Sequence, residues 1–438
     1  MKAPTTERGA APALLRPFQE FFAQEAAGAI LLLACTGVAL FWANSPWSDS
    51  YVRLWRTDVS IAVGRFAIAK SLHYWINDGL MAVFFFVVGL EIKREFLVGE
   101  LATPRQAVLP LAAAAGGMAV PALLFTAVNA GGPAGSGWGV PMATDIAFAL
   151  GVLSLLGPRV PLPLKVFLAA LAIVDDLGAV LVIALFYTDT ILIGWLGLGA
   201  ALFAVMIAMN RLHVRRPLPW TLLGTALWFA ILESGVHATI AGVLTALVIP
   251  ARSLIDAGNF AATTRTLLAE FTDDLPRSGG LTEDQRAAVL SLEVATEAVQ
   301  TPSARLEHAL HPWVAFFIVP VFALANAGVP LGGSFIRALA EPAAAGIMLG
   351  LVAGKPIGVM LFAWAAVRSG LAQPPAGVSW RQLWGAAALC GIGFTMALFI
   401  ADLAFGAPAQ LDAAKAGILA ASLVSGVIGW VVLRRDDP

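Results

Sequence analysis

The stretch that decides the fold is Leu168-Ala-Ala-Leu-Ala-Ile-Val-Asp-Asp-Leu-Gly-Ala-Val-Leu-Val-Ile-Ala-Leu-Phe186, in which two adjacent acids interrupt an apolar run. The run approaches the ~20 apolar residues that a membrane-crossing helix needs. An ionised side chain near the centre of a bilayer costs ~2.5–3.5 kcal/mol on insertion scales. Asp175 and Asp176 have apolar residues on both sides and cannot easily reach an interface, so we expect them to have a function inside the membrane.

The side chains of Asp175 and Asp176 are expected to point in different directions. Adjacent residues point ~100° apart on a helix, so one acid can face a cavity while the other faces a neighbouring helix. Two close carboxylates repel each other, and burial also disfavours their charged forms. We therefore expect the pair to hold either protons or a small cation, which is the competition that exchange transport needs. The alternative is a buried polar pair that only fixes helix packing.

The composition of the whole chain agrees with a membrane protein. Hydrophobic residues make up 59% of the 438 residues and charged residues 13%, whereas a soluble domain carries ~25% charged residues. A soluble core cannot absorb so much apolar sequence without a matching polar surface. No basic run indicates a nucleic-acid partner. Cys35 and Cys390 both lie in apolar segments and indicate no disulfide framework.

The apolar runs, separated mostly by Gly and Pro, predict an all-α integral membrane protein with twelve transmembrane helices. The predicted helices span residues 21–43, 73–96, 107–128, 140–157, 162–187, 191–210, 217–232, 235–249, 312–328, 343–367, 382–405 and 412–433. With loops assigned alternately to two sides, the side of the N-terminus holds 20 of the 27 Lys and Arg residues. Positively charged loops stay in the cytoplasm, so both termini are predicted to be cytoplasmic.

The twelve predicted helices divide the chain into five regions. They are a cytoplasmic N-terminal arm (1–20), helices 1–8 (21–249), a long cytoplasmic connection (250–310), helices 9–12 (311–433) and a cytoplasmic C-terminus (434–438). In the connection, Thr282 and Gln285 resemble a capping box, and apolar residues recur at helical spacing, which predicts one or two amphipathic helices. Residues 45–72 are predicted to form a short external region.

Lys355 is the only basic residue in the middle of a predicted span, in Gly350-Leu-Val-Ala-Gly-Lys-Pro-Ile-Gly358. A buried ammonium group strongly favours an acidic partner. We expect an ion pair with Asp175 or with Asp145, and the sequence does not choose between them.

Two helices are predicted to be interrupted. Asp145 lies in Gly139-Val-Pro-Met-Ala-Thr-Asp-Ile-Ala-Phe-Ala-Leu-Gly151, and a matching weak point is Leu389-Cys-Gly-Ile-Gly-Phe-Thr-Met396. Paired interruptions in the two halves of a chain indicate the binding site of a transporter. Helix ends at a break carry about half a unit of charge, which Asp145 and Lys355 can neutralise. Thr144 adds a hydroxyl oxygen, a ligand that suits hard cations.

A group of ionisable residues lies near the predicted cytoplasmic ends of helices 2 and 9. The six residues are Glu91, Arg94, Glu95, Glu307, His308 and His311. Glu91 and Glu95 share a helix face, and Arg94 lies one turn from Glu91. Because imidazoles titrate near neutrality, the group predicts a pH response at a cytoplasmic funnel. Ordinary interfacial ion pairs are the alternative. Asp78, near the external end of helix 2, is either an interfacial acid or a further site residue.

Seven sequence blocks resemble the motifs of one family. They are Asn77-Asp78, Gly89-Leu-Glu-Ile-Lys-Arg-Glu95, Ala143-Thr-Asp-Ile-Ala-Phe-Ala-Leu-Gly151, Ile173-Val-Asp-Asp-Leu177, Ser234-Gly-Val-His-Ala-Thr239, Leu306-Glu-His-Ala-Leu-His-Pro312 and Gly354-Lys-Pro356. Their order along residues 18–433 makes the resemblance to NhaA-type sodium/proton antiporters specific. The resemblance implies an inverted-topology repeat that relates helices 3–5 to helices 10–12, and crossed, discontinuous helices 4 and 11.

The resemblance also implies roles for the charged residues. Asp175 and Asp176 would bind Na⁺ or Li⁺ and protons, with Thr144 nearby, and Asp145 and Lys355 would compensate charge. Asp176 would be the direct cation ligand, and Asp175 the partner of the lysine. The six-residue cytoplasmic group would make transport respond to pH.

The implied function is secondary active antiport of cytoplasmic Na⁺ or Li⁺ against external protons, electrogenic and pH-regulated, serving sodium and pH homeostasis. The resemblance implies a multi-pass protein of a bacterial-type inner membrane, with no enzyme activity and no cofactor besides the transported ions. The expected partners are monovalent cations, protons and the lipid bilayer, with a homodimer kept as a hypothesis.

Three features depart from the family pattern: the length of the connection at 250–305, Glu233 beside the Ser234 block, and Asp402 near the outer end of helix 11. Two other functions stay open. One is a proton-coupled transporter of another small ion. The more remote one is an intramembrane aspartyl enzyme, which adjacent acids on one helix disfavour because they cannot flank a peptide bond.

Overall fold

A computed structural model of the chain describes residues 16–63, 66–188, 191–273 and 281–435. Most of the predicted N-terminal arm, residues 274–280 of the long connection and the last three residues lie outside the described residues. The chain divides into two compact units. The first comprises the residues up to Met81, Glu95–Thr188 and the residues from Trp313 onward, and the second comprises Ala82–Arg94 and Asp189–Pro312.

Nine helices of the described chain are long and apolar enough to cross a membrane, and ten if a bent pair counts as one span. The nine are the part Ala26–Ala43 of α1 (Arg16–Ala43), the continuous run α3–η2–α4 (Leu72–Val98), α5 (Pro104–Val128), η3 with α6 (Gly135–Leu155), α7 (Leu162–Phe186), α8 (Ile193–Arg211), α13–η5–α14 (Pro302–Asn326), α16–η6–α17 (Pro342–Arg368) and α20 (Pro408–Arg434). The bent pair is α18 (Trp380–Leu389) and α19 (Phe394–Ala404), with an angle of 46°.

The two other predicted spans correspond to short helices. α9 (Pro217–Glu233) has 17 residues and α10 (Thr239–Val248) has 10, whereas a straight crossing needs ~20. The all-helical membrane fold is therefore confirmed for nine or ten spans.

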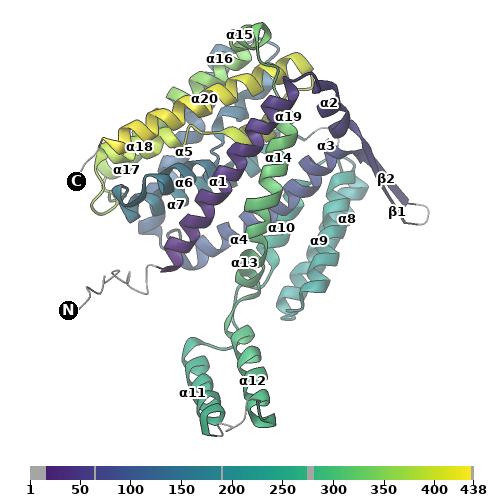
Figure 1. Ribbon diagram of the computed structural model, residues 1–438, viewed down its shortest axis with the longest axis vertical. Helices are drawn as coiled ribbons and strands as arrows, with labels where there is room; N and C mark the ends of the chain where they lie inside the picture. The colour runs from purple at the N-terminus through teal and green to yellow at the C-terminus, as the bar shows by residue number, and fades with distance from the viewer. Residues whose placement is uncertain (1–15, 64–65, 189–190, 274–280, 436–438) are drawn as a thin grey trace, which may run out of the picture. The chain divides into compact units, whose positions relative to one another are not determined.

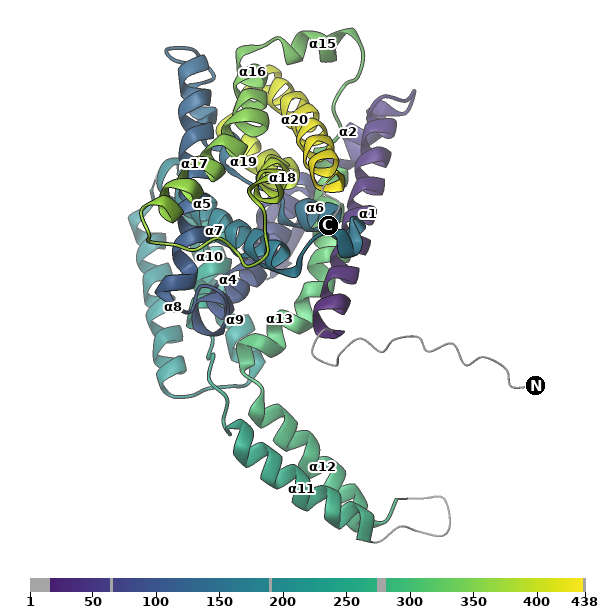
Figure 2. The ribbon, with the colours of Figure 1, turned by 90° about the vertical axis from the view of Figure 1, so that its left-hand side faces the viewer.

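Close backbone contacts pack the first unit. α5 lies along α17 (Lys355–Arg368) (Figure 2). A Cβ atom on Gly116 would lie 2.2 Å from the carbonyl oxygen of Gly358, and one on Gly358 would lie 2.1 Å from that of Gly116. Only glycine fits at such a crossing, and small residues are what allow membrane helices to approach closely. This crossing lies one turn from Lys355 and sets the position of that residue.

The region predicted as a short external segment contains α2 (Ser48–Arg56) and a two-stranded antiparallel hairpin of β1 (Asp58–Val63) and β2 (Phe66–Ser71) (Figure 1). The hairpin pairs Asp58 with Ser71 and Val63 with Phe66. The sequence analysis predicted no strands in this region. The β-branched residues Val59, Ile61 and Val63 recur at every second position, which favours a strand.

In the second unit, α8, α9 and α10 pack through a buried cluster that includes Met206, Trp220 and Leu227. The long connection forms an antiparallel helical hairpin of α11 (Ala257–Asp273) and α12 (Glu283–Val299), which both views show side by side (Figures 1 and 2). The predicted capping box of Thr282 and Gln285 opens α12, so the prediction of helices in this region is confirmed.

Candidate functional site

The first predicted interruption lies between two short helices. The 3-10 helix η3 (Gly135–Met142) ends at Met142, Ala143 and Asp145 are extended, and α6 (Ile146–Leu155) follows. Asp145 is the N-cap of α6, since its Oδ1 accepts a hydrogen bond of 3.1 Å from the Phe148 N–H. Its carboxylate thus satisfies an orphan donor at the positive end of the helix.

The second predicted interruption contacts the first. α18 ends at Leu389 and α19 begins at Phe394. The Asp145 N–H donates to the Ile392 carbonyl at 2.6 Å, and the Thr144 hydroxyl donates to the Cys390 carbonyl at 3.0 Å. The two broken helices therefore meet backbone to backbone.

Thr395, a residue that sequence reasoning did not single out, completes this contact. Its N–H donates to Asp145 Oδ2 at 2.9 Å, and its hydroxyl donates to the same oxygen. One buried carboxylate thus caps both α6 and α19. The signal for Thr395 was its position directly after Gly391-Ile-Gly-Phe394, but a threonine in an apolar helix is too common to stand out.

Lys355 pairs with Asp175. The distance from Lys355 Nζ to Asp175 Oδ2 is 2.7 Å, and both side chains have 0% exposure. Lys355 also donates to the Met142 carbonyl at the end of η3, so it faces a helix C-terminus as well as the acid. Of the two partners that the sequence left open, Asp175 is the one in contact.

Lys355 follows a π-helical segment, η6 (Gly350–Gly354). Such segments are rare and frequently lie at functional sites, because the wider turn re-aims the side chains that follow.

Asp175 and Asp176 lie in the middle of α7, with 1% and 2% exposure. Asp175 Oδ1 is buried and accepts no hydrogen bond from any described residue. Within the described residues no group of three or more His, Cys, Asp or Glu side chains is placed to hold a metal ion. A cation at the pair would therefore need hydroxyl, carbonyl or water oxygens as further ligands, and oxygen ligands suit a hard alkali ion.

Tyr187 connects the helix of the two acids to the segment before the break. Its hydroxyl donates to the Ser136 carbonyl at 2.8 Å and accepts from the Gly139 N–H at 3.1 Å. Tyr187 directly follows α7, so these bonds tie η3 to the end of that helix.

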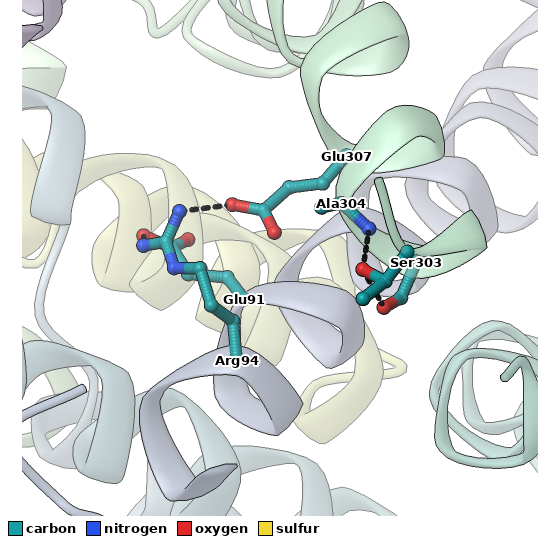
Figure 3. Close-up of polar contacts among 6 residues, drawn as sticks. Glu91, Arg94, Ser303, Ala304 and Glu307 are labelled. Carbon is teal, nitrogen blue, oxygen red and sulfur yellow. Dashed lines mark hydrogen bonds and ion pairs between the residues drawn. The ribbon is translucent and has the colours of Figure 1, made fainter. Parts of the chain in front are cut away.

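Three residues of the predicted cytoplasmic group form an ion-pair cluster in the second unit (Figure 3). Arg94 lies 3.7 Å from Glu91 on α4 (Met81–Val98) and makes a closer ion pair with Glu307 on α13 (Pro302–Trp313). The side chain of Arg94 is 41% exposed and that of Glu307 is 11% exposed. Thr301 caps α13 by accepting the Ala304 N–H at 3.2 Å, which fixes the turn that carries Glu307.

The other members of the group are arranged differently. His308 is exposed and makes no hydrogen bond or ion pair with any described residue. Glu95 accepts the Glu100 N–H at 3.1 Å and so closes the end of its own helix. His311 is half-buried in the last turn of α13. Asp78 is half-buried in the π-helical segment η2 (Trp75–Leu80), within electrostatic reach of Lys70 and Asp402.

The two ends of the long connection are held by neighbouring residues of α4. Lys93, which sequence reasoning missed, donates to the carbonyls of Leu247 at 2.7 Å and of Ile249, at the end of α10. Arg94 binds Glu307 on the returning side, and the Ser303 N–H donates to the Pro250 carbonyl at 3.2 Å. The connection therefore leaves and returns at one place.

The comparison with known proteins agrees with this geometry. The family described as Na⁺/H⁺ antiporter 1 matches residues 19–433. The chain belongs to this antiporter family. It is 56% identical over 97% of its length to the Na(+)/H(+) antiporter NhaA of Oleidesulfovibrio alaskensis, with 96% of that protein covered.

Other relatives in the antiporter family are nearly as similar. The NhaA of an Anaeromyxobacter species is 53% identical over 96% of this chain and 92% of its own length. The NhaA of Koribacter versatilis is 51% identical with the same coverage of 96% and 92%. The resemblance expected from seven sequence blocks is thus confirmed at the level of the family.

Proposed function

We propose that this member of the antiporter family exchanges Na⁺ or Li⁺ for protons, and that Asp175 and Asp176 hold the exchanged ions. The observation that carries the proposal is a buried carboxylate pair in which one acid is bound to Lys355 beside the meeting point of two broken helices. A carboxylate accepts either a proton or a hard cation, so the two ligands compete for the same oxygens.

The Lys355 ammonium group competes with the cation for one of these oxygens. In the described state its ammonium group occupies Asp175 Oδ2. A cation at that oxygen would meet a like charge in a low-dielectric site, so cation binding requires the ammonium to move away or to lose its proton. Asp176 and the hydroxyl oxygen of Thr144 would then complete the ligand set. Asp145 would keep its place at the helix N-termini and compensate their charge.

Exchange follows if the site opens alternately to the two sides. On the external side the carboxylates take up protons, and on the cytoplasmic side they release them and bind sodium. A net charge moved in each cycle couples transport to the membrane potential, at ~2.3 kcal/mol per 100 mV for each charge. Such a cycle is transport and not enzyme catalysis, and it needs no cofactor beyond the transported ions.

The proposed topology has twelve crossings, with α9 and α10 as the two short spans and both termini in the cytoplasm of a bacterial-type inner membrane. Helices 3–5 and 10–12 would form the inverted repeat, and the connection at 250–310 would be cytoplasmic. Cysteine labelling tests the sidedness. In a background without Cys35 and Cys390, Asp49→Cys should react with an impermeant reagent from outside and Ser253→Cys only from inside, and the reverse pattern would reject the topology.

The cytoplasmic group would set the pH response through the ion pairs of Arg94 with Glu91 and Glu307. Glu95, His308 and His311 are further candidates, since all three lie on the same two helices. Assembly as a homodimer is a separate hypothesis, which a mass measurement of the detergent-solubilised protein tests.

The direct test of function is sodium-dependent proton flux in everted membrane vesicles. We expect Na⁺ or Li⁺ to dissipate an imposed pH gradient and the Asp176→Asn variant to have no such activity. Undiminished exchange by that variant would reject the carboxylate site. Potassium chloride at equal concentration is the control, because a proton-coupled carrier of another small ion would respond to it.

A further inference from the structure

A second acid lies on α19, beyond the residue that holds Asp145. Asp402 follows Thr395 by seven residues, which places both on one face of the helix, about 10 Å apart along its axis. Thr395 donates to Asp145 at the break. The same helix face therefore runs from the broken-helix contact to Asp402, the acid that the sequence marks as a departure from the family pattern.

A chain of side-chain amides ends at this acid. His73 Nε2 lies 3.1 Å from Asn326 Oδ1, the Asn326 amide donates to Asn77 Oδ1 at 2.9 Å, and the Asn77 amide donates to Asp402 Oδ2 at 2.8 Å. Asn77 and Asn326 are 4% and 0% exposed. With these amide orientations the donor of each of the three bonds is on the side away from Asp402, and the Asn326 amide also donates to the Phe322 carbonyl at 3.1 Å. Hydrogen bonds in such a chain polarise one another, and a bond to an ionised acceptor is strengthened.

The amide chain therefore ends in a hydrogen bond to one oxygen of Asp402. It also joins α19 to η2 and to α14 (Val319–Asn326). Among the described residues, the Asn77 amide is the only hydrogen-bond donor to Asp402, and none of them donates to its second oxygen.

The charged groups around Asp402 lie on four elements, which are α20, η2, α3 and β2. Lys415 of α20, Asp78 of η2 and His73 of α3 (Leu72–Tyr74) interact with it electrostatically. One step further out, Asp412 acts on Lys415 and Lys70 acts on Asp78. Lys415 is buried with 9% exposure, yet it makes no ion pair within the described residues. The charge of Asp402 is therefore only partly balanced.

Helix packing alone does not require a charge here. A neutral asparagine or serine would accept the Asn77 amide as well, and a carboxylate in a membrane helix costs free energy that a neutral acceptor avoids. An anion that is partly balanced and has a free oxygen instead attracts protons and cations to its side of the membrane.

We propose that Asp402 determines affinity on the external side of the exchange cycle, by drawing protons and Na⁺ between the external solution and the Asp175–Asp176 pair. The Asn77–Asn326–His73 chain holds its carboxylate in place. The inference rests on the proposed antiport and on the proposed orientation, in which this end of α19 faces outward.

The test compares the two faces of the membrane. Asp402→Asn removes the charge and keeps an acceptor for Asn77. Sodium exchange is measured in right-side-out and in everted vesicles at fixed pH. We expect the half-saturating Na⁺ concentration at the external face to rise about three- to tenfold, while the value at the cytoplasmic face stays unchanged. Asp402→Glu should restore the external value, and Asp412→Asn is the matched control that should leave both values unchanged.

Several results would overturn the inference: no change at either face, an equal change at both, or a change at the cytoplasmic face alone. If Asp402→Asn does not accumulate in the membrane, Asp402→Ser carries the same test, and failure of both variants to fold would assign Asp402 a structural role instead. Failure of the proposed function is distinct, because the wild-type chain would then exchange no sodium in either vesicle type.

Discussion

Two ion pairs in this molecule have opposite surroundings. Lys355 and Asp175 lie in the middle of membrane helices with no exposed side-chain surface, whereas Arg94 and Glu307 lie near helix ends with side chains 41% and 11% exposed. A buried pair is weak evidence for net stability, but removing one partner is costly because the other charge remains buried. A half-exposed pair contributes little, because water replaces the missing partner. The first pair is therefore suited to hold an ion site, and the second can be broken with small structural consequence.

The largest expected effect is that of Lys355→Met. It leaves the Asp175 carboxylate buried without its cation, which should destabilise the protein by about 3–5 kcal/mol. Thermal unfolding in detergent measures the loss as a lowered midpoint. The double variant Lys355→Met with Asp175→Asn should recover part of it, and a single variant that melts with the wild type would contradict the comparison.

Thr395→Val should have the next largest effect, because it removes the hydroxyl that donates to Asp145 and keeps the shape of the side chain. A hydrogen bond to a charged group contributes about 1.5–3 kcal/mol. We expect a lowered unfolding temperature together with slower exchange. Thr395→Ser keeps the hydroxyl and is the matched control, so equal behaviour of the two variants would show that the bond is unimportant.

Tyr187→Phe tests a half-buried contact without charge. It removes two hydrogen bonds to η3, so a loss of about 1 kcal/mol is expected. Burial raises the pKa of Tyr187 from 10.0 to about 12, so the phenol is neutral in both folded and unfolded chains at lower pH. Its contribution should be the same at pH 6 and pH 9 and should fall only as the pH rises from 10 to about 12. A difference between pH 6 and pH 9 would speak against this assignment.

The smallest expected effect on stability is that of Arg94→Gln, below about 1 kcal/mol. The pH profile of exchange should nevertheless move, because the two acids Glu91 and Glu307 lose their shared cation. Arg305→Gln, which breaks an exposed pair with Glu297, is the control that should leave the profile in place. If both variants move it alike, a general charge effect explains the result.

The sequence singled out those residues of the candidate site that stand out against an apolar background. Asp175, Asp176 and Lys355 were found because charges in membrane helices are costly, and the two interruptions because glycine and proline cluster there. The partner of Lys355 needed the structure, since 180 positions separate the two residues in the chain. Thr395 and Lys93 were missed because a hydroxyl in a helix and a lysine near a helix end are common.

The sequence patterns also did not predict two features of the fold, the β-hairpin and the π-helical segments. The hairpin β1–β2 lies between apolar helices, and its alternation covers only six residues in each strand. The described chain also has π-helical segments at residues 75–80, 314–318 and 350–354, inside continuous helical runs. Hydrophobic periodicity does not distinguish such a short wider turn from the α-helix around it.

The two ends of the long connection lie close together, which has a practical consequence. Because the Ser303 N–H binds the Pro250 carbonyl, the chain returns close to the point where the connection began. Insertions succeed at places where the ends of a segment are close together. A fluorescent protein inserted between α11 and α12 would therefore be attached to the end of this helical hairpin. Its fluorescence would report where the transporter lies in living cells.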